Sequence, residues 1–148
     1  MLKRLLIVII CLMFTVGCSG LQMKPTVIPE GCEDSLIYSK LPYPQVTDTI
    51  LQVSVYNFAV ETGAAPQILD VINTIEAALA SPGGMNFSDF VLLVNEQVGL
   101  LNARWGVSLL IVSDSLADLN VPIPISDCDK NLLLKHLAKQ KKWVALAG

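Results

Sequence analysis

Proline and glycine residues divide the chain after residue 45 into segments in which apolar side chains recur with a helical period. The clearest is residues 65–80, which Pro66 opens in the first turn and the sequence SPGG closes. Its apolar face holds Ile68, Ile72, Ile75 and Leu79. Four or five such amphipathic segments joined by short turns predict a mainly α fold, a small helical bundle that follows an irregular N-terminal tether.

Four other segments show the same period. The one that starts at Asn86 or Ser88 places six apolar residues on one face: Phe87, Phe90, Val91, Val94, Val98 and Leu101. A helix from Val46, capped by Thr47 or Asp48 and ended by Gly63, would bury Val46, Ile50, Val53 and Val60. Residues 108–120 align Leu109, Val112, Leu116 and Leu119. A last helix, capped by Asp127, runs from about Cys128 to the C-terminus.

Two short stretches leave an α+β alternative open. Residues 51–56 (LQVSVY) alternate apolar and polar side chains, and residues 107–112 (VSLLIV) are rich in β-branched residues, so each could form a strand. Pro122 and Pro124 favour an extended backbone over residues 121–125, because proline disfavours helix in the residue before it.

The N-terminus carries an apolar run, Leu5 to Val16, directly after Lys3 and Arg4. A helix over this run would be about 18 Å long, well short of the ~30 Å hydrocarbon core of a bilayer. Its length and basic flank are typical of a signal peptide. Ordinary secretion and an uncleaved short anchor remain the alternatives.

The end of this run, Thr15-Val16-Gly17-Cys18, resembles the lipobox of bacterial lipoproteins, with Thr15 where leucine is usual. The resemblance implies removal of residues 1–17 and attachment of lipid, including acyl chains such as palmitate, to Cys18. Residues 18–45 would then be a lipidated tether and coil, and residues 46–148 the helical domain. Ser19 resembles the residue that permits transfer to the outer membrane, facing the periplasm, if the host has two membranes.

Export leaves Cys32 and Cys128 as a pair in a compartment where disulfides persist. One disulfide is the simplest interpretation, with two free thiols or a metal site as alternatives. A metal is disfavoured because no CxxC pair exists and His136 lies two helical turns from Cys128.

The charges are distributed unevenly along the chain. Residues 19–127 hold twelve acidic and three basic side chains, whereas residues 128–148 hold five lysines and one aspartate. A basic amphipathic helix with an aromatic residue could contact an anionic membrane or an envelope protein partner. The candidate contact residues are Lys135, Lys139, Lys141, Lys142 and Trp143. The alternative is an ordinary last helix with solvated lysines, and export disfavours nucleic acid as a partner.

The sequence lacks the common catalytic and nucleotide-binding motifs. His136 stands among lysines with no orienting carboxylate nearby in sequence, and Asp114 and Asp118 are a carboxylate pair of the kind usually solvated on a helix. We therefore expect no enzyme, cofactor or metal, but a lipid-anchored envelope protein with a structural or protein-interaction role. Two alternatives are a membrane-surface protein acting through its basic helix and a small envelope enzyme with an unrecognised site.

Overall fold

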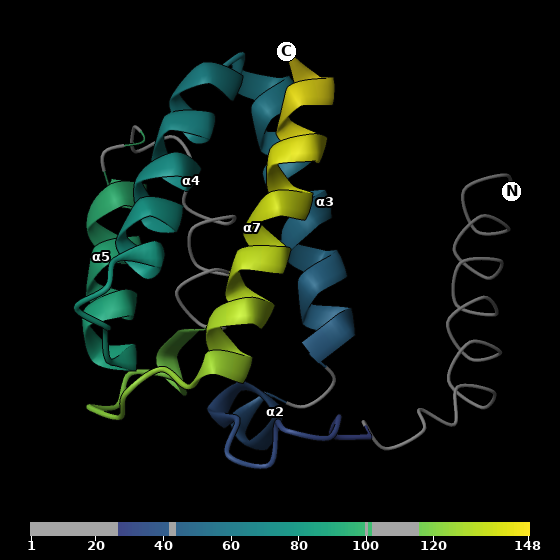
Figure 1. Ribbon diagram of the computed structural model, residues 1–148. Coiled ribbons are helices and arrows are strands. Elements are labelled where there is room, and N and C mark those ends of the chain that lie inside the picture. Colours follow the sequence, from purple (N-terminus) through teal and green to yellow (C-terminus); the bar gives the residue numbers. More distant parts are fainter. Residues whose placement is uncertain (1–26, 42–43, 100, 102–115) are drawn as a thin grey trace, which may run out of the picture.

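The computed structural model describes residues 27–41, 44–99, 101 and 116–148 and is mainly helical over these residues, as predicted (Figure 1). No β-strand occurs in them, and the one isolated β-bridge joins Asn86 to Pro124. The helices are α2 (Leu36–Lys40), α3 (Pro44–Thr62), α4 (Ala65–Ala80), α5 (Phe87–Gly99) and α7 (Asp127–Ala147).

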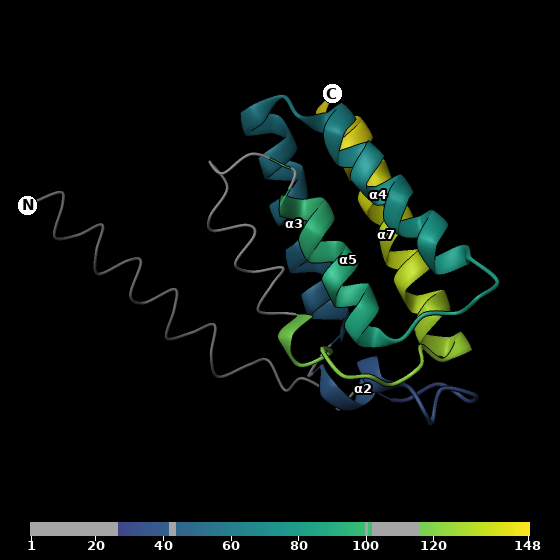
Figure 2. The same ribbon diagram turned by 90° about the vertical axis from the view of Figure 1, so that its left-hand side faces the viewer.

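The C-terminal helix α7 lies between α3 and α4 and makes most of its contacts with them (Figure 1). Figure 2 shows α4 and α5 as a layer on one side of the domain, with α3 and α7 behind. The short helix α2 crosses the end at which α7 begins. The last residue, Gly148, lies close to Ala65 at the start of α4, so α7 extends from one end of the domain to the other.

The helices α4 and α5 bury the faces that their sequences predict. Asn86 caps α5, because its side-chain oxygen accepts from the Asp89 backbone N–H at 2.8 Å. Val98 and Leu101, the last two residues of the predicted α5 face, are partly buried against the same core. The core residues of these two helices are Ala65, Ile68, Val71, Ile72, Ile75, Leu79, Phe87, Phe90, Val91 and Val94.

The predicted buried face of α3 is wrong. Ile50, Val53 and Val60 are each about half exposed, and the helix buries Phe58 and Ala59 instead. Apolar residues occur on more than one side of α3, so the period alone does not select the buried side; packing Phe58 buries more area than packing a valine. The side chains of Val46 and Thr47 lie outside the described part of the chain.

The start of α3 also differs from the prediction. The helix begins at Pro44, a residue well suited to a first turn, so Asp48 lies inside the helix rather than at its cap. The end is confirmed: the Gly63 N–H donates to the Ala59 carbonyl, and Gly63 has a φ of 66°.

The strand alternative is wrong for residues 51–56, which form part of α3. The other proposed strand, residues 107–112, lies outside the described residues, as do Leu109, Val112 and Asp114. Of the predicted helix 108–120, the structure describes only the end, where Leu119 is buried.

Residues 121–125 run beside the start of α5 and pair with Asn86 at Pro124, as an extended backbone would. The predicted extended backbone is wrong for the first part of the segment, because the chain bends at Val121 and Pro122 and the Ile123 N–H donates to the Val121 carbonyl at 2.8 Å. The Phe87 N–H donates to the Ile123 carbonyl at 2.9 Å, and the Ile125 N–H donates to the Met85 carbonyl at 3.0 Å. These hydrogen bonds hold the segment that connects Leu119 to α7 against the start of α5.

The segment before α3 is less irregular than expected, since it contains the helix α2. Ser35 caps α2 by accepting from the Tyr38 backbone N–H at 3.2 Å, and Ile37 is buried in the core. Residues 1–26, with Cys11 and Cys18, lie outside the described residues. Among the helices that the structure describes, none is both long and apolar enough to cross a membrane.

Candidate functional site

A disulfide joins Cys32 to Cys128, with Cα atoms 5.4 Å apart, which confirms the predicted pairing. Cys128 is in the first turn of α7, and Cys32 precedes α2 by four residues. The bond therefore fixes the N-terminal segment to the start of the last helix across a separation of 96 residues.

The carboxylate of Asp129 lies next to this disulfide and is 1 % exposed. It accepts hydrogen bonds from the Ser35 hydroxyl, from the Leu36 N–H at 3.0 Å and from the Ile37 N–H at 3.3 Å. It also accepts from the Ser126 hydroxyl at 2.9 Å, while the Asp129 N–H donates to that hydroxyl at 3.1 Å. One buried side chain thus satisfies the first N–H groups of α2 and closes the cap of α7.

The predicted cap of α7, Asp127, is wrong, and this role of Asp129 was not predicted. Ser126 is the N-cap, and Asp129 stands at the third helical position, which is the spacing of a capping box. That spacing was available in the sequence. The contact with α2 was not, because the residues it joins are more than 90 positions apart.

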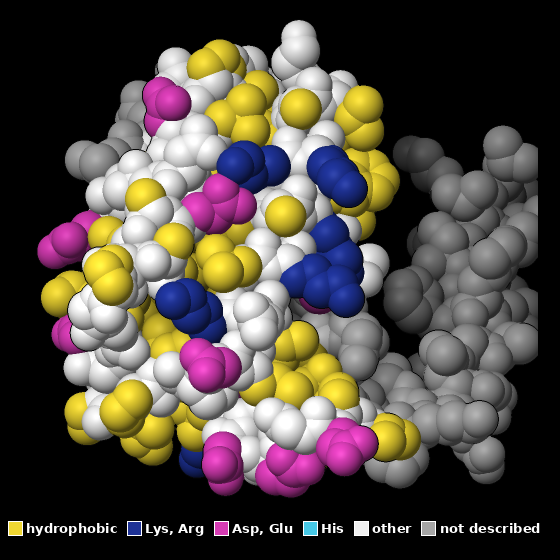
Figure 3. All heavy atoms as spheres, viewed as in Figure 1, with side chains coloured by type: hydrophobic (Ala, Val, Ile, Leu, Met, Phe, Trp, Pro, Cys, Tyr) yellow, Lys and Arg dark blue, Asp and Glu magenta, His cyan; other side chains and the backbone are white. Residues whose placement is uncertain are grey.

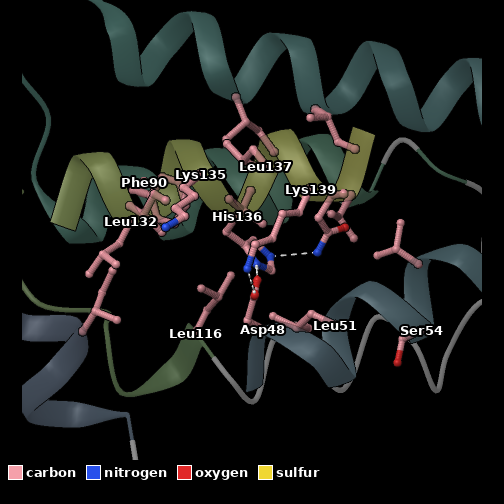
Figure 4. A pocket seen from close by; sticks show the side chains of 18 of the residues that line it. Asp48, Leu51, Ser54, Phe90, Leu116, Leu132, Lys135, His136, Leu137 and Lys139 are labelled. Atoms are coloured by element: carbon pink, nitrogen blue, oxygen red, sulfur yellow. Dashed lines mark hydrogen bonds and ion pairs between the residues drawn. The ribbon is translucent and has the colours of Figure 1, made fainter. Parts of the chain in front are cut away.

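A second feature is an apolar cavity of about 350 Å³ between α3, α4, α5 and α7. It is lined mainly by aliphatic and aromatic side chains, among them Leu51, Phe58, Phe90 and Leu132 (Figure 4). Leu101 and Leu116 also line the cavity; they stand on either side of residues 102–115, which the structure does not describe. Four of the polar side chains on its wall, Asp48, His136, Lys139 and Gln140, form one cluster.

That cluster joins α3 to α7 through Asp48. One Asp48 oxygen contacts His136 Nδ1, and the other accepts from Lys139 Nζ at 2.7 Å (Figure 4). Gln140 Nε2 lies 2.7 Å from His136 Nε2. Partial burial would raise the pKa of Asp48, but hydrogen bonds from Lys139, His136 and Gln52 outweigh it and hold the pKa below its ordinary value of 3.8.

The cluster corrects one expectation, because Asp48 gives His136 the orienting carboxylate that the sequence does not place nearby. A carboxylate beside an imidazole is half of a catalytic arrangement, but the second ring nitrogen must face a nucleophile or a substrate. In this protein the second ring nitrogen faces the buried Gln140 amide. The arrangement therefore holds α3 against α7, and both ring nitrogens are occupied.

Metal-ligand groups give no further site within the described residues. No cluster of three or more His, Cys, Asp or Glu side chains there could hold a metal ion.

The predicted contact residues on α7 fall into two groups. Lys139 pairs with Asp48, and Lys141 pairs with Glu76 on α4 at 2.7 Å. Trp143 packs edge-to-face on Tyr56 of α3, with ring centroids 5.6 Å apart. Lys135 and Lys142 are exposed and form no ion pair among the described residues.

Comparison with known proteins gives no relative. No family model, no curated protein and no solved structure matches the chain.

Proposed function

We propose that the protein is an exported lipoprotein, anchored through Cys18, whose helical domain has a structural or protein-interaction role in the cell envelope. The observation that carries this proposal is the Cys32–Cys128 disulfide, because such bonds persist in oxidising compartments outside the cytosol. The apolar run and the sequence around Cys18 supply a route to that compartment and an anchor in it.

The internal bonding of the domain supports a non-enzymatic role. The buried Asp129 carboxylate uses its oxygens to cap helices, and the Asp48–His136 pair is closed by Lys139 and Gln140. Groups that do chemistry must present a free donor, acceptor or lone pair to a substrate. These groups instead bind one another and hold the helices together.

The anchor is tested by expressing the full chain in a two-membrane host and measuring the intact mass of detergent-extracted protein. We expect loss of residues 1–17 and a mass increase from acyl groups at Cys18. Cys18→Ser should abolish both, whereas Cys11→Ser, a matched change in the discarded segment, should alter neither. The proposal would be contradicted if the Cys18→Ser protein still lost residues 1–17, still carried the acyl mass and was still recovered with the membrane.

The membrane in which the anchor resides is tested with Ser19. In the lipoprotein class that residues 15–18 resemble, Asp after the lipidated cysteine favours retention in the inner membrane. Separation of the two membranes should therefore recover the unaltered chain with the outer membrane and Ser19→Asp with the inner one. Identical distributions would argue against outer-membrane sorting while leaving lipidation intact.

A further inference from the structure

Five large apolar side chains lie exposed on the outer faces of α3 and α7. The exposed fraction is 48 % for Ile50, 50 % for Val53 and 53 % for Val60 on α3, and 42 % for Trp143 and 75 % for Leu146 on α7. We call this set, together with Tyr56 and the lysines that border it on α7, the α3–α7 surface. It contains Ile50, Val53 and Val60, which the sequence pattern assigned to the core of α3 and which the fold leaves about half exposed to water.

The two halves of this surface are continuous. The helices α3 and α7 pack side by side, and the Tyr56 ring touches Trp143 across their boundary. Tyr56 lies three residues after Val53 and four before Val60, so it is their neighbour on α3. Leu146 follows Trp143 by three residues and is its neighbour on α7.

Lysines border this apolar patch on α7. Lys135, Lys139, Lys142 and Leu146 are spaced by four, three and four residues, which places them on one stripe of the helix. Figure 3 shows lysine side chains following α7, with hydrophobic side chains beside them. Lys141 lies toward α4, where it pairs with Glu76, and is not part of the stripe.

Carboxylates do little to neutralise the stripe. On α3 and α7, Asp48 is already shared by His136 and Lys139, and Asp127 and Asp129 stand at the far end of α7. Glu61 is the remaining carboxylate of α3, and it is exposed near the end of that helix. The described part of the α3–α7 surface therefore combines apolar side chains with two unpaired lysines, Lys135 and Lys142.

We propose that the α3–α7 surface docks on the headgroup region of an anionic lipid bilayer. Its charge complements anionic headgroups, and an exposed tryptophan beside aliphatic side chains and long lysine stems is the combination that lies at membrane interfaces. Docking would bury the apolar side chains that the fold leaves in water.

The tether of the proposed lipoprotein allows this orientation, and this step rests on lipidation of Cys18. Val27 follows Cys18 by nine positions, enough to extend about 30 Å. The 21-residue helix α7 is about 31 Å long, and the described chain begins at its N-terminal end. A domain anchored at that end can therefore lie on its side, and the anchor raises the effective concentration of a weakly binding surface.

The proposal is tested with the full chain reconstituted into vesicles of phosphatidylcholine alone or with about one third phosphatidylglycerol. Trp105→Phe leaves Trp143 as the only tryptophan. Lipids brominated on the acyl chains should then quench Trp143 emission more strongly in the anionic vesicles. High salt should reduce this difference, because it screens the lysines.

Lysine variants test whether the lysines of this surface, and not the net charge of the protein, promote docking. Lys135→Gln with Lys142→Gln should lower the docked-to-undocked ratio about thirtyfold, the effect expected for two basic residues at an anionic surface. Lys40→Gln with Lys130→Gln removes the same charge elsewhere and should leave the ratio nearly unchanged. Equal effects of the two pairs would overturn the proposal.

An apolar pair of variants provides the second control. Leu146→Gln should weaken quenching, whereas Leu92→Gln on α5, where the side chain is 58 % exposed, should not. If Trp143 is shielded from a water-soluble quencher without being reached by the brominated chains, a protein covers the surface and the lipid proposal is wrong.

Flotation of the vesicles distinguishes this proposal from the anchor. A chain that floats with both kinds of vesicle but shows equal Trp143 quenching in them is anchored and does not dock. A chain that fails to float with neutral vesicles contradicts the anchor, while stronger quenching in anionic vesicles would still support docking.

Discussion

Two carboxylates attach other helices to α7, and they do so by different physical means. Asp129 is buried beside the disulfide and accepts four hydrogen bonds from uncharged hydroxyl and backbone N–H donors. Asp48 is partly exposed and is held by a lysine and a histidine. The first junction fixes α2 to the start of α7, and the second fixes α3 to its middle.

The difference predicts where the domain is rigid and where it responds to solution conditions. Buried donors that lose their acceptor cannot turn to water, so the Asp129 junction is costly to break. Exposed ion pairs are screened by salt, and water can hydrate their charges when they break. The Asp48 junction should therefore contribute less to the free energy of unfolding than the Asp129 junction, and its contribution should depend on pH and ionic strength.

Removing the disulfide should produce the largest loss of stability. Cys32→Ser with Cys128→Ser opens a loop of nearly a hundred residues, for which the chain-entropy model gives about 4.7 kcal/mol. Denaturant unfolding of the oxidised chain and the double variant measures the difference. A loss below about 1 kcal/mol would mean that the Asp129 hydrogen bonds hold this end without the covalent bond.

Asp129→Ala should cost about 3 kcal/mol, because it leaves buried donors of α2 without an acceptor. Asp127→Ala is the matched control, since Asp127 is exposed in the same turn of α7 and makes no side-chain hydrogen bond among the described residues. Both variants are compared by denaturant unfolding. Equal losses would show that negative charge near the helix N-terminus, and not the buried hydrogen bonds, is the source of stability.

Asp48→Asn should lower the free energy of unfolding by about 1 kcal/mol at neutral pH, and this difference should disappear in acid. The pKa of Asp48 is lowered in the folded chain, so its charged form stabilises the fold above the unfolded-state pKa. This contribution is lost as the pH falls through the folded-state value, which lies below 3.8. Unfolding free energies measured from pH 7 to pH 2.5 should converge for the two proteins, and a constant difference would contradict this origin.

Lys139→Gln should have the smallest measurable effect, below about 1 kcal/mol, and the effect should fade in high salt. Lys142→Gln, without an ion pair among the described residues, should change stability less. Thermal unfolding at low and high salt compares them. If the loss of stability in Lys139→Gln persists in high salt, the Asp48–Lys139 ion pair is shielded from solvent more than the partial exposure of Asp48 indicates.

The helices whose apolar residues occupy one side were predicted well. In α4 and α5 the apolar period and the flanking turn residues agree, and Asn86 caps α5, so the buried faces follow from local sequence alone. The helix α3 carries apolar residues on several sides, and the same reasoning chose the side that faces solvent. The short helix α2 was missed because prolines and glycines surround its five residues.

The side chains of the proposed α3–α7 surface could be named only in part from the sequence. The sequence identified Lys135, Lys142 and Trp143, but it could not show that Lys141 faces α4 or that Tyr56, Val53 and Val60 extend the surface onto α3. These facts depend on the angle at which two helices meet. That angle is set by packing between residues distant in sequence.

The sequence by itself determined the helical class, the turns and the concentration of lysines near the C-terminus, because each depends on residue type and short-range spacing. It made Cys32 and Cys128 candidate partners only because the lipobox resemblance accounts for Cys11 and Cys18. Only the tertiary structure decided which carboxylates became junctions and which apolar residues stayed outside. Asp129 and Asp48 acquired their roles from partners more than 80 residues away. Such contacts form only when whole helices pack, and the faces already buried by that packing determine which side remains exposed.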